Sequence, residues 1–72
     1  MIQKIAILGS TGSIGKSTLE IIKKDKKNFN VILLTANNNY LKLIQQAKEF
    51  KVKNVIIRNK KFFKKVKDSL KK

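Results

Sequence analysis

The fold of this chain is decided by residues 4–15, which read Lys4-Ile5-Ala6-Ile7-Leu8-Gly9-Ser10-Thr11-Gly12-Ser13-Ile14-Gly15. The apolar run that ends at Leu8 is typical of a strand buried on both faces of a parallel sheet, and a helix is predicted to begin near Ser13. Between them lies a G-x-x-G-x-x-G turn, in which glycines let the backbone bend and approach a ligand closely. The unpaired N–H groups of the helix's first turn would point at an anion. The stretch therefore predicts a turn that holds the pyrophosphate of a nucleotide.

The glycine spacing by itself is a weak signal. The common dinucleotide-binding fingerprint is G-x-G-x-x-G, whereas this chain has one more residue between its first two glycines. The alternative is an ordinary glycine-rich turn without a ligand. The strand before the turn and the helix after it favour nucleotide binding, because that is the context in which such turns hold phosphates.

The charge of the chain suggests a different partner. Eighteen basic residues against four acidic ones give a formal net charge of +14, the electrostatic footprint of a nucleic-acid-binding module. All but one of the basic residues are lysines scattered along the chain, whereas base and bidentate phosphate recognition favour arginine. Lys, Asn and Ile make up almost half of the chain, a bias that an AT-rich genome imposes through its codons. We therefore do not expect specific nucleic-acid binding, although polyanions would bind non-specifically at low salt.

Residue types exclude several other kinds of site. The chain has no Cys and no His, which excludes a disulfide framework and a thiolate or imidazole metal site within it. The four acidic residues, Glu20, Asp25, Glu49 and Asp68, are dispersed and predict neither a metal site nor a catalytic pair. The first strand is predicted to begin near Ile2, which leaves no room for a leader peptide, and the apolar stretches are too short to span a bilayer. We expect a cytoplasmic protein that contacts no membrane.

The rest of the chain repeats the strand and helix pattern twice. Strands are predicted at about residues 3–8, 30–36 and 53–58, and helices at about residues 13–25, 39–50 and 60–71. Short connections imply right-handed crossovers and the strand order 3-2-1, which is one half of a Rossmann-type doubly wound α/β sheet. Asn59 is predicted to cap the last helix. The predicted core faces of the helices hold Ile14, Thr18, Ile21 and Ile22, then Tyr40, Leu43, Ile44, Ala47 and Phe50, then Phe63, Val66 and Leu70.

A complete fold of this class needs more than these elements. Its first strand is central and is flanked on the other side by a fourth strand, for which the chain has no candidate. An apolar strand left at an open edge favours aggregation, and about 70 residues bury little core. We therefore expect residues 1–72 to be the N-terminal part of a larger nucleotide-binding domain, without the catalytic domain.

Several stretches of the chain together resemble one enzyme family. Residues 4–15, continued by Thr18-Leu19-Glu20-Ile21-Ile22 and Phe29-Asn30-Val31, are similar to the opening of the 1-deoxy-D-xylulose 5-phosphate reductoisomerases, and Gln46-Ala47-Lys48-Glu49-Phe50 resembles that family's second helix. The resemblance implies an NADPH-dependent oxidoreductase that isomerises the phosphorylated sugar 1-deoxy-D-xylulose 5-phosphate and reduces it to 2-C-methyl-D-erythritol 4-phosphate, on the non-mevalonate route to isoprenoids. It also implies a homodimer and a divalent metal, Mg²⁺ or Mn²⁺, whose ligands lie outside this chain.

The resemblance further implies two groups of cofactor-binding residues. Residues of the glycine turn would contact the cofactor's phosphates and nearby groups, namely Thr11, Gly12, Ser13 and Ile14. Residues after the second strand would lie beside the adenine ribose, namely Asn37, Asn38 and Asn39. No catalytic residue is implied within this chain, which alone is expected to be inactive.

The asparagine segment departs from the family's pattern. The family commonly has a glycine and then a lysine where this chain has Asn37 and Asn38, and two prolines common in the family are here Lys26 and Val52. No acid ends the second strand, which favours NADPH because such an acid would bind a free ribose 2′-hydroxyl and exclude a phosphate. Lys42, one helical turn from the asparagines, could supply the missing positive charge. The alternative role of the asparagines is a helix cap with turn residues.

Two other functions stay open on the sequence. One is a fragment of another Rossmann NAD(P) oxidoreductase or epimerase with the same loop spacing. The other is a small basic nucleic-acid-binding module.

Overall fold

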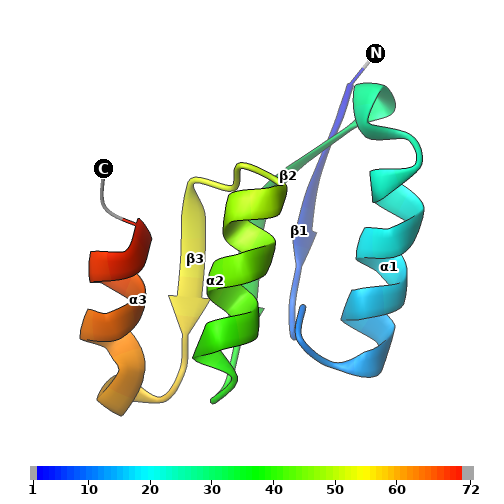
Figure 1. The fold of residues 1–72 in the computed structure, drawn as a ribbon. Helices are drawn as coiled ribbons and strands as arrows, with labels where there is room; N and C mark the ends of the chain where they lie inside the picture. The colour runs from blue at the N-terminus through cyan, green and yellow to red at the C-terminus, as the bar shows by residue number, and fades with distance from the viewer. Residues whose placement is uncertain (1, 71–72) are drawn as a thin grey trace.

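The computed structural model describes residues 2–70, which form one parallel three-stranded sheet and three α-helices (Figure 1). The strands pair in the order β1-β2-β3, which confirms the predicted order 3-2-1. The predicted helix at about 60–71 ends at Leu70, and residue 71 lies outside the described residues. The elements in chain order are β1 (Gln3–Ile7), α1 (Ser13–Lys23), the 3₁₀ turn η1 (Lys26–Asn28), β2 (Phe29–Ala36), α2 (Tyr40–Glu49), β3 (Asn54–Ile57), the 3₁₀ turn η2 (Lys60–Phe62) and α3 (Phe63–Leu70).

The helices pack on one face of the sheet, with α2 between α1 and α3 (Figure 1). Two successive right-handed crossovers that move in one direction across a sheet place their helices on the same face. The apolar core lies between the two layers and draws on all three helices. On the opposite face Ile32 and Ile56 stay exposed, so within residues 2–70 the sheet is covered on one face, not on both as the apolar strands predicted.

An irregularity in the pairing of β1 with β2 changes which side chains of β2 face the core. Ile5 pairs with Val31 but Ala6 pairs with Leu33, so β2 holds one extra residue, Ile32. An extra residue reverses the alternation of side chains beyond it. Val31 is buried before this bulge, and the buried residues after it are Leu34 and Ala36. Thr35 is therefore directed away from the helices, toward the end of β1.

The core face of α1 differs from the prediction. Leu19, Ile22 and Gly15 are buried, whereas Ile14 is 85% exposed and Ile21 is 67% exposed, so the placement of these two isoleucines on the core face was wrong. Gly15 decides which face of α1 is buried. A pattern of apolar side chains cannot reveal this, because glycine has no side chain. An ideal Cβ at Gly15 would lie 2.5 Å from the carbonyl oxygen of Gly9, so the helix can approach the loop here only because this residue is glycine.

The faces of α2 and α3 follow the predicted pattern more closely. Leu43, Ile44 and Ala47 are buried on α2, with Tyr40 and Phe50 packed against the core. On α3 Val66 is buried and Leu70 packs against the core, but Phe63 is 59% exposed and was wrongly predicted as core. Phe62 takes its place and stacks on Tyr40 with ring centroids 4.5 Å apart. Asn59 accepts a hydrogen bond from the Lys61 N–H at 3.0 Å, capping the η2 turn that leads directly into α3.

Candidate functional site: a phosphate-binding loop at the carboxyl end of the sheet

The loop between β1 and α1 is anchored to the end of β2. The Gly9 N–H donates to Thr35 Oγ1 at 2.9 Å, and the Ser10 N–H donates to the Thr35 carbonyl oxygen at 2.8 Å. The first bond depends on the outward direction of the Thr35 side chain that the bulge in β2 produces, whereas the second joins backbone to backbone. Gly9 has a φ of 71°, in the left-handed region that favours glycine. The loop is thus held rigidly before any ligand arrives.

A buried polar pair anchors the same loop to α2. Ser10 Oγ donates to Gln46 Oε1 at 2.7 Å, and Gln46 Nε2 donates to the Ser10 carbonyl oxygen at 2.9 Å. Ser10 is 0% exposed and Gln46 is 5% exposed, so these bonds are shielded from water. Buried polar groups that are fully paired favour a single arrangement of the backbone. Sequence reasoning missed both residues, since a lone glutamine on a helix gives no sign of its partner.

Gly12 has no structural reason to be glycine. Its φ of −78° and ψ of 175° form an extended backbone that any residue adopts, and an added Cβ would meet its nearest neighbour, Gly9 O, at an ordinary 3.5 Å. This contrasts with Gly15, where a Cβ would collide with backbone atoms at 2.5 to 2.8 Å. Packing within the described residues therefore does not require a glycine at position 12.

The N-terminus of α1 is open to an anion. Gly12 is the N-cap and has no side chain that could accept from the first-turn N–H groups, and the first turn holds no acidic residue. Such N–H groups, together with the positive end of the helix dipole, bind phosphates. The predicted residues Thr11, Gly12, Ser13 and Ile14 lie together at this point. The donor set fits a pyrophosphate.

The three asparagines after β2 have three different environments. Asn37 lines a hollow beside the loop. Asn38 Oδ1 accepts from Asn59 Nδ2 at 2.7 Å, and Asn39 Oδ1 caps α2 by accepting from the Lys42 N–H at 3.2 Å. The cap and turn roles weighed from the sequence are therefore present for Asn39 and Asn38. Contact of the three residues with an adenine ribose stays a prediction.

The hollow beside the loop has a volume of about 510 Å³ and opens at the carboxyl ends of all three strands. In open α/β sheets, ligands bind at this edge. The hollow is lined by Leu8, Gly9, Thr35, Ala36, Asn37, Ile56 and Arg58. Arg58 was not predicted from the sequence as a site residue. Two signals could have found it, because it is the one arginine of the chain and it directly follows β3.

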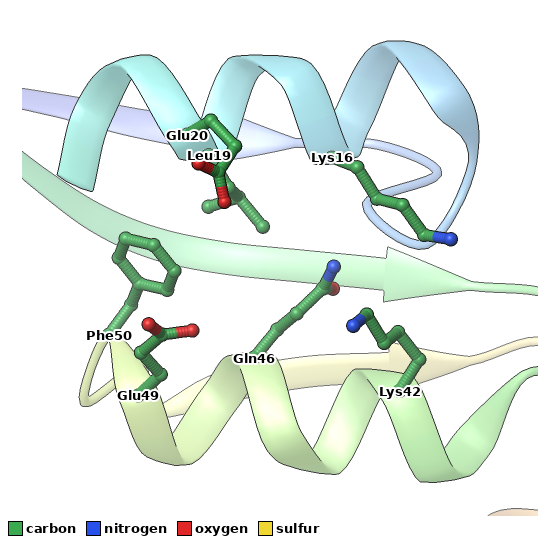
Figure 2. Close-up of a pocket in the computed structure, with 7 residues that line it drawn as sticks. All are labelled: Lys16, Leu19, Glu20, Lys42, Gln46, Glu49 and Phe50. Carbon is green, nitrogen blue, oxygen red and sulfur yellow. The ribbon is translucent and has the colours of Figure 1, made fainter. Parts of the chain in front are cut away.

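A second, smaller groove of about 120 Å³ lies between α1 and α2 (Figure 2). Lys16 and Lys42 extend into it beside Gln46, so the side chain of Lys42 is directed toward α1. Near the far end of α1, Lys23 forms an ion pair with Glu49 at 3.0 Å. The hydrogen bond to Glu49 and the negative charges of Glu49 and Glu20 raise the pKa of Lys23 above its ordinary value.

The described part of the chain offers neither a metal-binding cluster nor a membrane-spanning helix. Within residues 2–70, no group of three or more acidic, His or Cys side chains comes together as a metal ion would require. None of the helices in that range has the length and apolar character needed to cross a bilayer.

Comparison with known proteins decides the family. The sequence profile of the 1-deoxy-D-xylulose 5-phosphate reductoisomerase family matches residues 5–72, which is nearly the whole chain. The chain belongs to the 1-deoxy-D-xylulose 5-phosphate reductoisomerase family. The reductoisomerase of Pelagibacter ubique is 67% identical over 55 residues, which cover 76% of this chain and 14% of that protein.

Solved structures of this family share the fold. The Zymomonas mobilis reductoisomerase in complex with NADPH superposes with a TM-score of 0.93 at 36% identity, covering 97% of this chain and 18% of that one. A reductoisomerase solved with NADPH, fosmidomycin and magnesium gives a TM-score of 0.90 at 32% identity over 96% of this chain and 17% of that one. This chain thus spans less than one fifth of the length of these relatives, and it matches their Rossmann-like fold.

Proposed function

We propose that residues 1–72 form the N-terminal, NADPH-binding part of the Rossmann domain of a 1-deoxy-D-xylulose 5-phosphate reductoisomerase. The observation that carries the proposal is the pair of glycines in the loop. Gly15 is required by the packing of α1 on Gly9, whereas no contact within residues 2–70 requires a glycine at position 12, which leaves space directly over the helix N-terminus. That space is where the pyrophosphate of a dinucleotide approaches the backbone.

The residues of this chain bind and orient the cofactor. The N–H groups at the start of α1 hold the pyrophosphate, and the bonds from Gly9 and Ser10 to Thr35 keep those groups in place without reorganisation on binding. Asn37, Asn38 and Asn39 lie beside the adenine ribose at the end of β2. The bound NADPH supplies the hydride for reduction.

The complete enzyme would convert 1-deoxy-D-xylulose 5-phosphate to 2-C-methyl-D-erythritol 4-phosphate, as a cytoplasmic homodimer that also uses Mg²⁺ or Mn²⁺. The relative solved with magnesium and fosmidomycin supports the metal. Since the described residues hold no acidic cluster, the metal ligands would come from other parts of the enzyme. Specific nucleic-acid binding is not part of the proposal.

The experiment is a turnover assay on the complete protein that carries residues 1–72, with 1-deoxy-D-xylulose 5-phosphate, Mg²⁺ and NADPH. We expect loss of NADPH absorbance that depends on both the sugar phosphate and the metal. A folded protein that binds NADPH but leaves this substrate unchanged would contradict the reductoisomerase and favour another Rossmann oxidoreductase.

A further inference from the structure

Arg58 is the one charged side chain among the described residues that line the hollow beside the phosphate-binding loop. The hollow is otherwise lined by apolar and neutral side chains and by backbone. None of the four acidic residues of the chain lines it, and Lys42 is directed into the groove between α1 and α2 (Figure 2). No carboxylate lines the hollow, so none would compete with an incoming anion for the Arg58 guanidinium.

The backbone of Arg58 is fixed against the residues that follow β2. Its N–H donates to the Ala36 carbonyl oxygen at 2.9 Å, and the Asn59 N–H donates to the Asn37 carbonyl oxygen at 3.0 Å. The Asn59 side chain adds its bond to Asn38 at 2.7 Å. The two strand ends are therefore joined by three hydrogen bonds, which hold Arg58 beside the segment where Rossmann-type sites read the ribose 2′ position.

We infer that Arg58 binds the 2′-phosphate of NADPH and is the residue of this chain that selects NADPH over NADH. This inference rests on the proposed function. A planar guanidinium pairs with phosphate oxygens through two parallel N–H···O bonds and stays charged at every physiological pH. NADH has only a hydroxyl at this position, so it gains nothing from the cation. The absence of an acid at the end of β2 removes the group that would favour NADH.

The test compares two ligands that differ only in the 2′-phosphate, adenosine 2′,5′-bisphosphate and adenosine 5′-monophosphate. Their affinities for the complete protein are measured by isothermal titration calorimetry at fixed ionic strength, for wild type, Arg58→Gln and Arg58→Lys. We expect Arg58→Gln to weaken the bisphosphate at least tenfold and to change the monophosphate less than twofold. Arg58→Lys keeps the charge but not the bidentate geometry, and we expect an intermediate loss.

The matched control is Lys27→Gln, which removes one exposed positive charge at the opposite end of β2, in the η1 turn. We expect it to change neither affinity by more than twofold. If Arg58→Gln weakened both ligands by the same factor, the inference would be overturned and the proposed function would stand. The same holds if Lys27→Gln weakened the bisphosphate as much as Arg58→Gln does. A wild-type protein that binds neither ligand would overturn both.

Discussion

Replacing Gly15 or Gly12 by a residue with a side chain should have different effects. We expect the first to lower the stability of the fold and the second to lower the affinity for NADPH. At Gly15, a Cβ would lie 2.5 to 2.8 Å from three backbone atoms of Gly9 and Ser10, none of which can move without shifting the loop. Overpacking of this kind costs about 1 to 3 kcal/mol, against which alanine regains about 1 kcal/mol of helix propensity. Contacts this short with backbone atoms fall at the upper end of that range, about 3 kcal/mol, so we expect Gly15→Ala to lower the free energy of unfolding by about 2 kcal/mol.

At Gly12, the expected loss is in binding and not in stability. The extended backbone accepts valine, and the Cβ contact at 3.5 Å is ordinary. The branched side chain would fill the space over the N-terminus of α1, so we expect NADPH affinity to fall at least tenfold, or about 1.4 kcal/mol. Gly12→Ala should leave the fold unchanged and cost less affinity than Gly12→Val.

The assay measures urea unfolding by circular dichroism and NADPH affinity by titration, for Gly12→Ala, Gly12→Val and Gly15→Ala in the complete protein. We expect Gly15→Ala to lose stability and Gly12→Val to lose NADPH affinity. Gly12→Val with unchanged NADPH affinity in a folded protein would refute the assignment of the loop. Gly15→Ala with wild-type stability would refute the packing argument.

Four further predictions follow from the anchors of the loop and from the charge of the chain. Thr35→Val removes the acceptor of the Gly9 N–H, so we expect the free energy of unfolding in urea to fall by about 1 kcal/mol and NADPH to bind severalfold more weakly. Unchanged stability and affinity would show that this bond does not hold the loop. Gln46→Leu removes the donor to the buried Ser10 carbonyl oxygen and leaves Ser10 Oγ only its longer bond to the Thr35 carbonyl oxygen at 3.4 Å, so it should cost about 1 to 3 kcal/mol in the same unfolding measurement. Wild-type stability of Gln46→Leu would show that the pair is dispensable. Asn38→Lys adds a cation at the end of β2 and should raise the ratio of kcat/KM for NADPH over NADH, and a lower ratio would place the ribose elsewhere. The 72-residue chain made alone should show no turnover and a weak helical signal that grows with added salt, because salt screens lysine repulsion; a salt-independent, cooperative unfolding would contradict this.

The strand order and the position of the glycine loop between β1 and α1 were predictable because they depend on local signals, whereas phosphate binding by that loop stays a prediction. Three apolar runs separated by helical patterns fix an α/β fold, and a glycine turn between a strand and a helix marks the loop. The core face of α1 was not predictable from side-chain pattern, because Gly15 defines it by the absence of a side chain. Ile14 and Ile21 share a helical stripe but lie off the face that Gly15 forces against the loop.

The long-range contacts of the site were also beyond the sequence. The direction of the Thr35 side chain depends on a bulge at Ile32, which local residue preferences do not predict. The bonds between Ser10 and Gln46 join residues 36 positions apart, and Arg58 reaches the hollow only because β3 pairs beside β2. Periodicity describes one element at a time, so it says nothing of such pairs.

The most direct measurement of the central claim uses a chimera with the Pelagibacter ubique reductoisomerase, to which this chain is 67% identical over 55 residues. The aligned segment of that enzyme is replaced by the residues of this chain, and the dissociation constant for NADPH is measured by titration beside the parent enzyme and the same chimera carrying Gly12→Val. The account predicts that the chimera binds NADPH within tenfold of the parent and that Gly12→Val weakens this binding at least tenfold further. A folded chimera that does not bind NADPH, or whose binding is indifferent to Gly12→Val, would contradict it.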